Sequence, residues 1–264
     1  MVRRGLVASR EQALAAVTGG RVLVGGAPAE KAARLVAPGD AIVVQGPAPR
    51  FVSRGGEKLA AALDHFQIDV AGRRALDAGA STGGFTDCLL QRGAATVTAV
   101  DVGRGQLHQR LLADDRVRSL ERTNIRSLSL EAVGGAAFDV VVADLSFISL
   151  RTVADALLLR LAAPGADVVL LIKPQFEAGR AQVSAGRGVI RDPEVWADVL
   201  ETVGSALVGH RAAMMGVMVS PLTGADGNVE FLAHLLADEP ASSGPAIDFV
   251  ALAADAALRH GRAG

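Results

Sequence analysis

The sequence is short of sulfur-bearing and aromatic side chains. Among its 264 residues it has a single cysteine, Cys88, no tyrosine, and only 3% aromatic residues. One cysteine excludes an internal disulfide and every zinc site built from several cysteines. With so few rings, stacking of nucleic-acid bases on aromatic platforms is not expected to dominate any ligand contact. We expect Cys88 to face the core of the protein.

A strong net charge and long apolar runs are also absent. The formal net charge is −1, so contact with nucleic acid would depend on local basic patches. No apolar run approaches the ~18 residues of a membrane span, and the N-terminus lacks a basic-then-apolar signal pattern. These features predict a cytoplasmic protein without a membrane segment, built as one large domain plus a smaller one.

Residues 1–46 have the helix-capping and turn residues of a small α+β unit. Ser9 and Gln12 form a capping-box pattern at the start of a helix, and Gly19-Gly20 ends it. Strands are expected over residues 21–24 and 41–44. Six basic residues stand against three acidic ones, which indicates either a solvated face or a surface that contacts RNA phosphates. The basic residues are Arg3, Arg4, Arg10, Arg21, Lys31 and Arg34.

The order of elements in this unit carries a resemblance. Residues 4–13, 20–24 and 39–42 resemble the S4-like RNA-binding domain. That resemblance implies a helix pair with a small sheet, and binding of structured RNA.

Residues 47–58 are expected to hold a linker and the start of the larger domain, because Pro47 and Pro49 favour a stiff, extended connector. The larger domain is then expected over residues 59–264, beginning with a short helix over residues 59–66. Lys58 falls in the first turn of this helix, where the helix dipole disfavours a cation. It is either a surface residue without a role or one that contacts phosphate or takes part in chemistry.

From residue 73 onward, short apolar strands alternate with helical patterns. Strands are expected over residues 74–78, 96–101, 117–121, 138–144 and 166–173, and helices over residues 84–92, 105–113, 151–162 and 193–208. This alternation predicts an α/β fold with a parallel, Rossmann-like sheet. Residues 211–220 and 228–236 predict a terminal hairpin, which fits the reversed last strand of a class I methyltransferase sheet. A last helix is expected over residues 249–258.

The organising stretch of the larger domain is a glycine-rich turn over residues 76–85. Glycines let the backbone lie against a ligand, and the helix that follows directs free N–H groups toward it. Asp101 follows Gly79 by 22 residues, where doubly wound sheets place a carboxylate on ribose hydroxyls. The pattern therefore indicates a nucleotide-like ligand, with an ordinary tight turn between strand and helix as the alternative.

Charged residues stand at strand ends that a buried sheet would otherwise keep apolar. Asp144 and Lys173 each close an apolar run, and Glu230 lies within the terminal hairpin strand. Ligands of such sheets bind beyond the carboxyl ends of the strands, so we expect these side chains to meet Lys58 near the glycine turn. Two cations and two anions there suit deprotonation of a ribose 2′-hydroxyl beside a cationic methyl donor. Lys173 would be the base, Asp144 would orient its amine, and Glu230 would position Lys58.

Six segments together resemble the TlyA family, which joins an S4-like domain to an FtsJ-like 2′-O-ribose methyltransferase. They are residues 53–59 (SRGGEKL), 77–89 (DAGASTGGFTDCL), 99–103 (AVDVG), 144–149 (DLSFIS), 172–176 (IKPQF) and 186–189 (GRGV). The resemblance implies methylation of cytidine in ribosomal RNA of one or both subunits, with S-adenosylmethionine as the donor. It also carries an old haemolysin label.

The resemblance also implies which residues of this sequence form the catalytic, donor-binding and RNA-binding sites. The catalytic tetrad falls on Lys58, Asp144, Lys173 and Glu230. The donor is expected along the glycine turn and the next strand ends, at Asp77, Gly79, Ser81, Thr82, Gly83, Gly84, Phe85, Asp101, Asn124 and Asp144. RNA contact is expected from the basic residues of residues 1–46 and from Arg50, Arg54, Arg180 and Arg187.

Three other readings remain open from the sequence. A membrane-lytic protein would need an apolar or strongly amphipathic basic span, and a nicotinamide dehydrogenase would leave the tetrad unexplained. An RNA-binding protein without methyltransferase activity is the third. We expect no metal requirement and favour a monomer.

Overall fold

The structure is a computed structural model that describes residues 1–7, 10–47, 49–186 and 188–260. Ser9 of the expected capping box and Arg187 lie outside these residues. The side chains of Gln12 and Arg180 also lie outside what is described.

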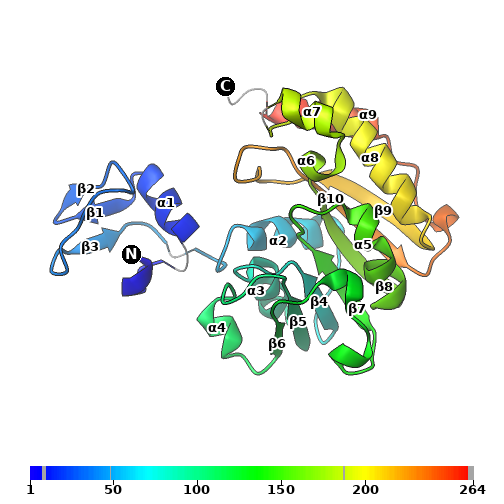
Figure 1. The fold of residues 1–264 in the computed structure, drawn as a ribbon, viewed down its shortest axis with the longest axis horizontal. Helices are drawn as coiled ribbons and strands as arrows, with labels where there is room; N and C mark the ends of the chain where they lie inside the picture. Colours follow the sequence, from blue (N-terminus) through cyan, green and yellow to red (C-terminus); the bar gives the residue numbers. More distant parts are fainter. Residues whose placement is uncertain (8–9, 48, 187, 261–264) are drawn as a thin grey trace.

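The N-terminal residues form a small unit with its own sheet, at the left of Figure 1. Strand β1 (Val22–Val24) pairs antiparallel with β2 (Ala27–Pro28) and with β3 (Ile42–Val44). Helix α1 (Arg10–Thr18) packs on this sheet through a core of five small or β-branched residues. The described part of this unit holds one α-helix, and a single 3₁₀ turn (Val2–Arg4) stands where the helix pair would begin. Gly5 ends that turn with a φ of 66°.

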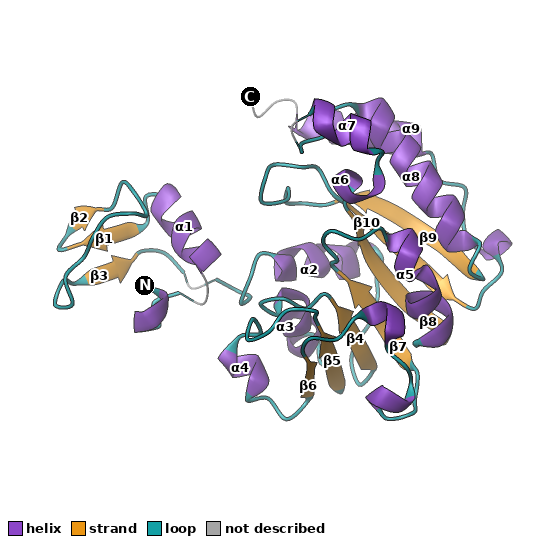
Figure 2. Cartoon of the chain, in the orientation of Figure 1, coloured by secondary structure: helices purple, strands orange, loops and turns teal. Residues whose placement is uncertain are grey.

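The larger domain is built on a seven-stranded sheet in the order β6-β5-β4-β7-β8-β10-β9. Neighbouring strands from β6 to β8 are parallel, whereas β10 is antiparallel to both β8 and β9. The expected Rossmann-like methyltransferase sheet with a reversed terminal strand is therefore confirmed (Figure 2). The strands are β4 (Arg74–Ala78), β5 (Thr96–Val100), β6 (Val117–Leu120), β7 (Phe138–Ala143), β8 (Ala162–Ile172), β9 (Ala212–Val219) and β10 (Phe231–Ala237).

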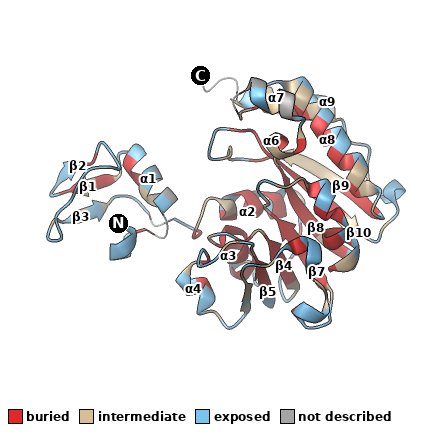
Figure 3. Ribbon diagram, in the orientation of Figure 1, coloured by how far each residue is buried: buried red, intermediate tan, exposed pale blue. Residues whose placement is uncertain are grey.

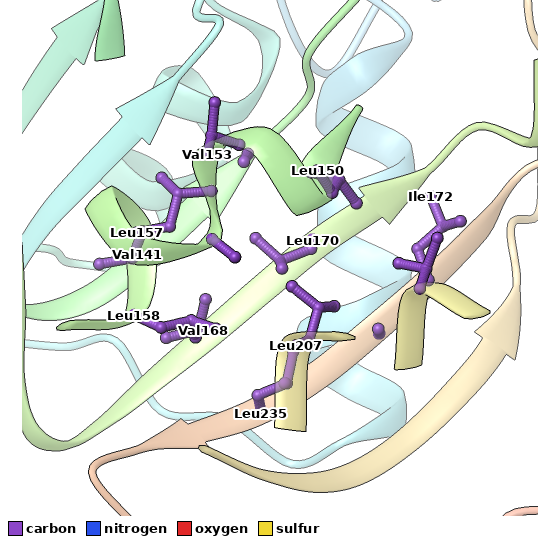
Figure 4. Packing of buried hydrophobic residues seen from close by; sticks show 14 of the residues in the cluster. Val141, Leu150, Val153, Leu157, Leu158, Val168, Leu170, Ile172, Leu207 and Leu235 are labelled. Atoms are coloured by element: carbon purple, nitrogen blue, oxygen red, sulfur yellow. The ribbon is translucent and has the colours of Figure 1, made fainter. Parts of the chain in front are cut away.

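The two faces of the sheet are covered by different helices. Successive residues of a strand point to opposite faces, so Val140 and Val142 of β7 join one core while Val141 and Ala143 join the other. Helices α2 (Gly55–His65) and α3 (Gly84–Gln91) cover the first face. Helices α5 (Leu150–Ala154), α8 (Pro193–Val208) and α9 (Phe249–His260) cover the second. Figure 4 shows the second core, where Leu170 of β8 lies between Leu150 and Leu207.

Burial differs sharply between the two parts of the chain. Buried residues fill the sheet and the inner faces of its helices, whereas the N-terminal unit is mostly exposed (Figure 3). Cys88 on α3 is fully buried, as expected. Among the described residues, no helix is long and apolar enough to cross a bilayer.

Several expected boundaries are wrong. The helix expected over residues 105–113 is the single turn α4 (Gln109–Leu112), and the helix expected from residue 59 begins at Gly55. The helix expected over residues 151–162 is α5 followed by a π-helical segment (Asp155–Arg160). Glu230 precedes β10 and does not lie within it. These differences arise because strand pairing and helix packing, not local periodicity, set where an element ends.

Candidate active site

The glycine turn between β4 and α3 is shaped by two separate steric demands. Gly79 has a φ of 84°, and a Cβ there would collide with the main-chain carbonyl of Asp144. Gly83 has a φ of 98°, and a Cβ there would run into the side chains of Leu107 and Leu111. Gly79 thus lets two strand ends approach one another, whereas Gly83 is required by packing below the turn.

Asp77 supports this turn from behind. It is fully buried, and its Oδ2 accepts hydrogen bonds from Thr86 N at 2.8 Å and from Thr86 Oγ1 at 2.6 Å. Burial raises the pKa of Asp77 to about 7, although the Thr86 hydrogen bonds oppose that shift. The carboxyl group therefore ties the end of β4 to the first turn of α3.

A cavity of about 350 Å³ opens beside the turn, and we name it the Asp101 cavity. The two carboxylate oxygens of Asp101 accept hydrogen bonds from Ser81 N at 2.8 Å and from Gly103 N at 2.6 Å. Asn124 also lines this cavity, and its side chain accepts a hydrogen bond from Arg126 N. The other lining residues are mainly apolar and include Val100, Val102, Ile125, Leu145, Phe147 and Ile148.

A second cavity of about 350 Å³, which we name the Lys173 cavity, also borders the turn. Four expected catalytic side chains line it, each from a different element. Lys58 comes from α2, Asp144 follows β7, Lys173 follows β8, and Glu230 precedes β10. The tertiary structure thus gathers four residues that are spread over most of the chain.

These four side chains form two ion pairs. Lys58 Nζ contacts Glu230 Oε2, and both side chains are under 10% exposed. Lys173 Nζ lies 2.5 Å from Asp144 Oδ1, and the Asp144 side chain is 25% exposed. Burial raises the pKa of Glu230, and the charge of Lys58 opposes that shift.

The two cavities adjoin. Gly79, Ser81, Asp144 and Ser146 line both of them. A ligand in the Asp101 cavity can therefore present an atom to a group in the Lys173 cavity across these residues.

The other expected ligand residues divide between the cavities. Gly79, Ser81, Asp101, Asn124 and Asp144 line the Asp101 cavity. Thr82, Gly84 and Phe85 line the Lys173 cavity. Asp77 and Gly83 line neither of the two and act from behind the turn.

Sequence reasoning missed Ser146 and Gln106. Ser146 Oγ accepts a hydrogen bond from Lys173 Nζ at 3.0 Å, and Gln106 Oε1 accepts one from Ser81 Oγ at 3.1 Å. The two serines in the segment that begins at Asp144, DLSFIS, are the signal that could have indicated Ser146. Within the described ranges, no three His, Cys, Asp or Glu side chains gather closely enough to hold a metal ion.

The basic residues expected to contact RNA have different local surroundings. Arg4 donates to the carbonyl groups of Asp40 at 2.6 Å and Ala37 at 2.8 Å, so its guanidinium braces the N-terminal unit. Arg54 lines the Lys173 cavity, and the Arg50 guanidinium lies 4.7 Å from the ring centre of Phe51. Arg3, Arg4, Arg10, Lys31 and Arg34 line a groove of about 600 Å³ on the N-terminal unit, and Arg21 is half-buried beside Gly46.

Comparison with known proteins matches both parts of the chain. The family model of the FtsJ-like methyltransferases matches residues 51–236, and that of the S4 domain matches residues 1–42.

Individual relatives cover most of the chain. The 16S/23S rRNA (cytidine-2′-O)-methyltransferase TlyA of Mycobacterium tuberculosis is 51% identical over 89% of this chain and 87% of that protein. Hemolysin A of Brachyspira hyodysenteriae is 40% identical over 88% of this chain and 95% of that protein. A solved structure of a Streptococcus thermophilus protein that carries the hemolysin name is 38% identical. It covers 99% of this chain and 96% of that one, with a TM-score of 0.80.

Proposed function

Because the chain belongs to the FtsJ-like methyltransferases of the TlyA family, with an S4 domain at its N-terminus, we propose that it methylates a ribose 2′-hydroxyl of ribosomal RNA. The observation that carries this proposal is the convergence of Lys58, Asp144 and Lys173 with Glu230 on one cavity beside the glycine turn. The name of the Mycobacterium tuberculosis relative supports cytidine as the nucleotide and either ribosomal subunit as its source. We place this activity in the cytoplasm, where ribosomal RNA is found.

S-adenosylmethionine fits the Asp101 cavity as the methyl donor. Each carboxylate oxygen of Asp101 accepts one main-chain N–H and keeps a second lone pair, which can accept from a ribose hydroxyl. Val102 and Ile125 offer apolar contacts for a base, and Asn124 offers polar groups. We assign donor binding to Gly79, Ser81, Asp101, Asn124 and Asp144, with Thr82, Gly84 and Phe85 closing the side next to the Lys173 cavity.

When bound, S-adenosylmethionine supplies an electrophilic methyl group. The protein must then orient a ribose 2′-hydroxyl and remove its proton. Lys173 in its neutral form accepts that proton at Nζ, and Asp144, 2.5 Å away, balances the positive charge that forms. The buried pair of Lys58 and Glu230 lines the same cavity, where Glu230 positions Lys58.

Contact with RNA is assigned to positive surfaces outside the tetrad. The basic residues of residues 1–46 and Arg50 are exposed or half-buried, and Arg54 leads from the surface into the Lys173 cavity. Arg180 and Arg187 belong to the same proposal on the strength of the sequence. Such contacts neutralise phosphates and release counterions, so binding should weaken steeply with salt.

Transfer of a tritiated methyl group from S-adenosylmethionine to ribosomal RNA tests the proposal. The full chain is incubated with purified 16S and 23S RNA and with assembled subunits, and the modified nucleotide is located after nuclease digestion. A chain lacking residues 1–46 serves as the comparison. We expect it to bind the donor normally but to leave ribosomal RNA unmodified.

The alternative activities are assayed on the same preparation. Lysis of erythrocytes or reduction of a nicotinamide cofactor, without methyl transfer to any RNA, would overturn the proposal. RNA binding without methyl transfer would support an RNA-binding protein with an inactive methyltransferase domain. Full activity of the truncated chain would disprove the role of the N-terminal unit alone.

A further inference from the structure

Ser146 stands where the two cavities meet, next to the proposed base. It lies two residues after Asp144, lines both cavities, and accepts a hydrogen bond from Lys173 Nζ at 3.0 Å. We infer that Ser146 is a positioning residue for methyl transfer, whose hydroxyl directs the amine of Lys173 toward the acceptor ribose. This inference rests on the proposed role of Lys173 as the base.

Asp144 attracts the amine of Lys173 electrostatically but does not by itself fix the direction in which the amine points. Asp144 Oδ1 lies 2.5 Å from Lys173 Nζ, yet within the described part of the chain this buried oxygen has no hydrogen bond of acceptable geometry. The contact with Ser146 Oγ does have hydrogen-bond geometry. The carboxylate therefore supplies electrostatic attraction, and the hydroxyl supplies the angular restraint.

The chemistry of a neutral amine makes this restraint useful. A neutral lysine amine has two N–H bonds and one lone pair. When one N–H bond is directed at Ser146 Oγ and the amine lies against the Asp144 carboxylate, the lone pair can face the Lys173 cavity. The protonated form keeps the same two partners, so the group accepts a proton without moving.

The loop that carries Ser146 is itself fastened near both ends. Asp144 N donates to Ala78 O at 3.0 Å. At the other end, Glu177 accepts from Ser149 Oγ and from Leu150 N, each at 2.6 Å. Glu177 lies four residues after Lys173. Its hydrogen bonds therefore join the segment that carries the base to the loop that carries Ser146.

The backbone within this loop is also held in an unusual conformation. Phe147, directly after Ser146, has a φ of 65°, a region that costs about 1 kcal/mol for a residue with a Cβ. Such a conformation persists when its surroundings determine it, and here the fastened loop ends do so. Ser146 is therefore presented to Lys173 by a defined backbone.

A matched pair of variants isolates the hydroxyl. Ser146→Thr and Ser146→Val have nearly the same bulk, but only the first can accept the hydrogen bond. Single-turnover rates are measured at saturating S-adenosylmethionine and ribosomal RNA, with the dissociation constants of both measured separately. We expect Ser146→Val to be about tenfold slower than Ser146→Thr, the size expected for one hydrogen bond to a charged group. Neither dissociation constant should differ between the two variants.

A double-mutant comparison shows whether Ser146 acts through Lys173. Ser146→Ala is measured in the wild-type chain and in Lys173→Ala, with Ser205→Ala on the exposed face of α8 as the control. We expect Ser146→Ala to slow the wild-type chain about tenfold and to have no further effect in Lys173→Ala. Equal slowing in both backgrounds would show that Ser146 acts independently of Lys173 and would overturn the inference.

The outcomes also separate this inference from the proposed function. Equal rates for Ser146→Thr and Ser146→Val, with Lys173→Ala strongly impaired, would overturn the role of Ser146 and leave the base in place. Wild-type activity in Lys173→Ala would show that Lys173 is not the base, and it would overturn the inference about Ser146 as well. A rise in the dissociation constant for RNA in Ser146→Val would assign Ser146 to substrate binding.

Discussion

The Asp101 cavity and the Lys173 cavity have about the same volume and share four lining residues, but the rest of their linings differ in polarity. The Asp101 cavity is largely apolar, and its carboxylate is held by main-chain N–H groups. The Lys173 cavity gathers two lysines and two carboxylates in two ion pairs. In the proposed function, the first cavity binds the ribose-bearing part of the methyl donor, and the second moves a proton.

The largest expected effect lies in the Lys173 cavity. If Lys173 is the base, Lys173→Ala should lower turnover by at least ~10² while the affinities for donor and RNA change little. Lys173→Arg should fail nearly as badly, because a guanidinium stays protonated and cannot accept a proton. Single-turnover rates at saturating RNA provide the measurement, and the wild-type rate should rise with pH to a plateau.

The rival to this prediction is a phosphate clamp. In that case Lys173→Arg would keep most of the activity, and the loss in Lys173→Ala would be found mainly in weaker RNA binding. The Arg variant at saturating RNA therefore decides between a base and a clamp.

The second largest effect should be on stability and comes from the buried ion pair. Glu230→Leu leaves Lys58 buried without its partner, which should lower the free energy of unfolding by about 3 kcal/mol. Replacing both partners, as Lys58→Met with Glu230→Leu, should recover most of that loss, because no charge is left unpaired. Denaturant unfolding measures the difference, and neither variant should methylate RNA. A double variant as unstable as Glu230→Leu would contradict this account.

Substitutions in the Asp101 cavity should change the affinity for the donor rather than the turnover. Asp101→Ala should weaken the affinity for S-adenosylmethionine by ~1–3 kcal/mol, because charge-assisted hydrogen bonds are lost. Titration calorimetry measures it, with Lys173→Ala as the control that keeps donor affinity. Wild-type affinity in Asp101→Ala would place the donor elsewhere. Valine at Gly79 is a poorer test, since it would strain the fold against Asp144.

The smallest effect concerns Asp77, which belongs to neither cavity. Its pKa is raised by burial from 3.8 to about 7, so the folded state prefers the protonated form. Its contribution to stability is therefore full below the unfolded pKa and is lost as the pH rises through about 7. Between about pH 6 and about pH 8 the loss should be about 1 kcal/mol.

Asp77→Asn provides the comparison for that pH dependence. Asn keeps an oxygen that can accept from Thr86 but carries no titratable group. Thermal unfolding across this pH range should show a smaller drop for the variant than for the wild type. An equal drop in both proteins would assign the pH dependence to other groups.

The sequence by itself determined the class of fold and the place of the site. Continuous apolar runs such as residues 140–143 predict strands buried on both faces, and the glycines at 79 and 83 predict the turn between β4 and α3. The reversal of the last strand was also readable, because a hairpin pattern replaces the usual strand-helix alternation. These features are local, since they depend on side-chain periodicity and backbone freedom within one element.

The sequence predicted that the four charged side chains meet, and only the tertiary structure decided their distances, their burial and their further contacts. Lys58 and Glu230 are separated by 172 residues, and their contact depends on the insertion of β10 between β8 and β9. The contact of Ser146 with Lys173 depends on the parallel pairing of β7 with β8. Asp77 and Gly83 have the residue types of ligand contacts, yet burial and packing turn them away from both cavities. Periodicity predicts which face of an element is buried, whereas strand order and register decide which side chains come within hydrogen-bond distance.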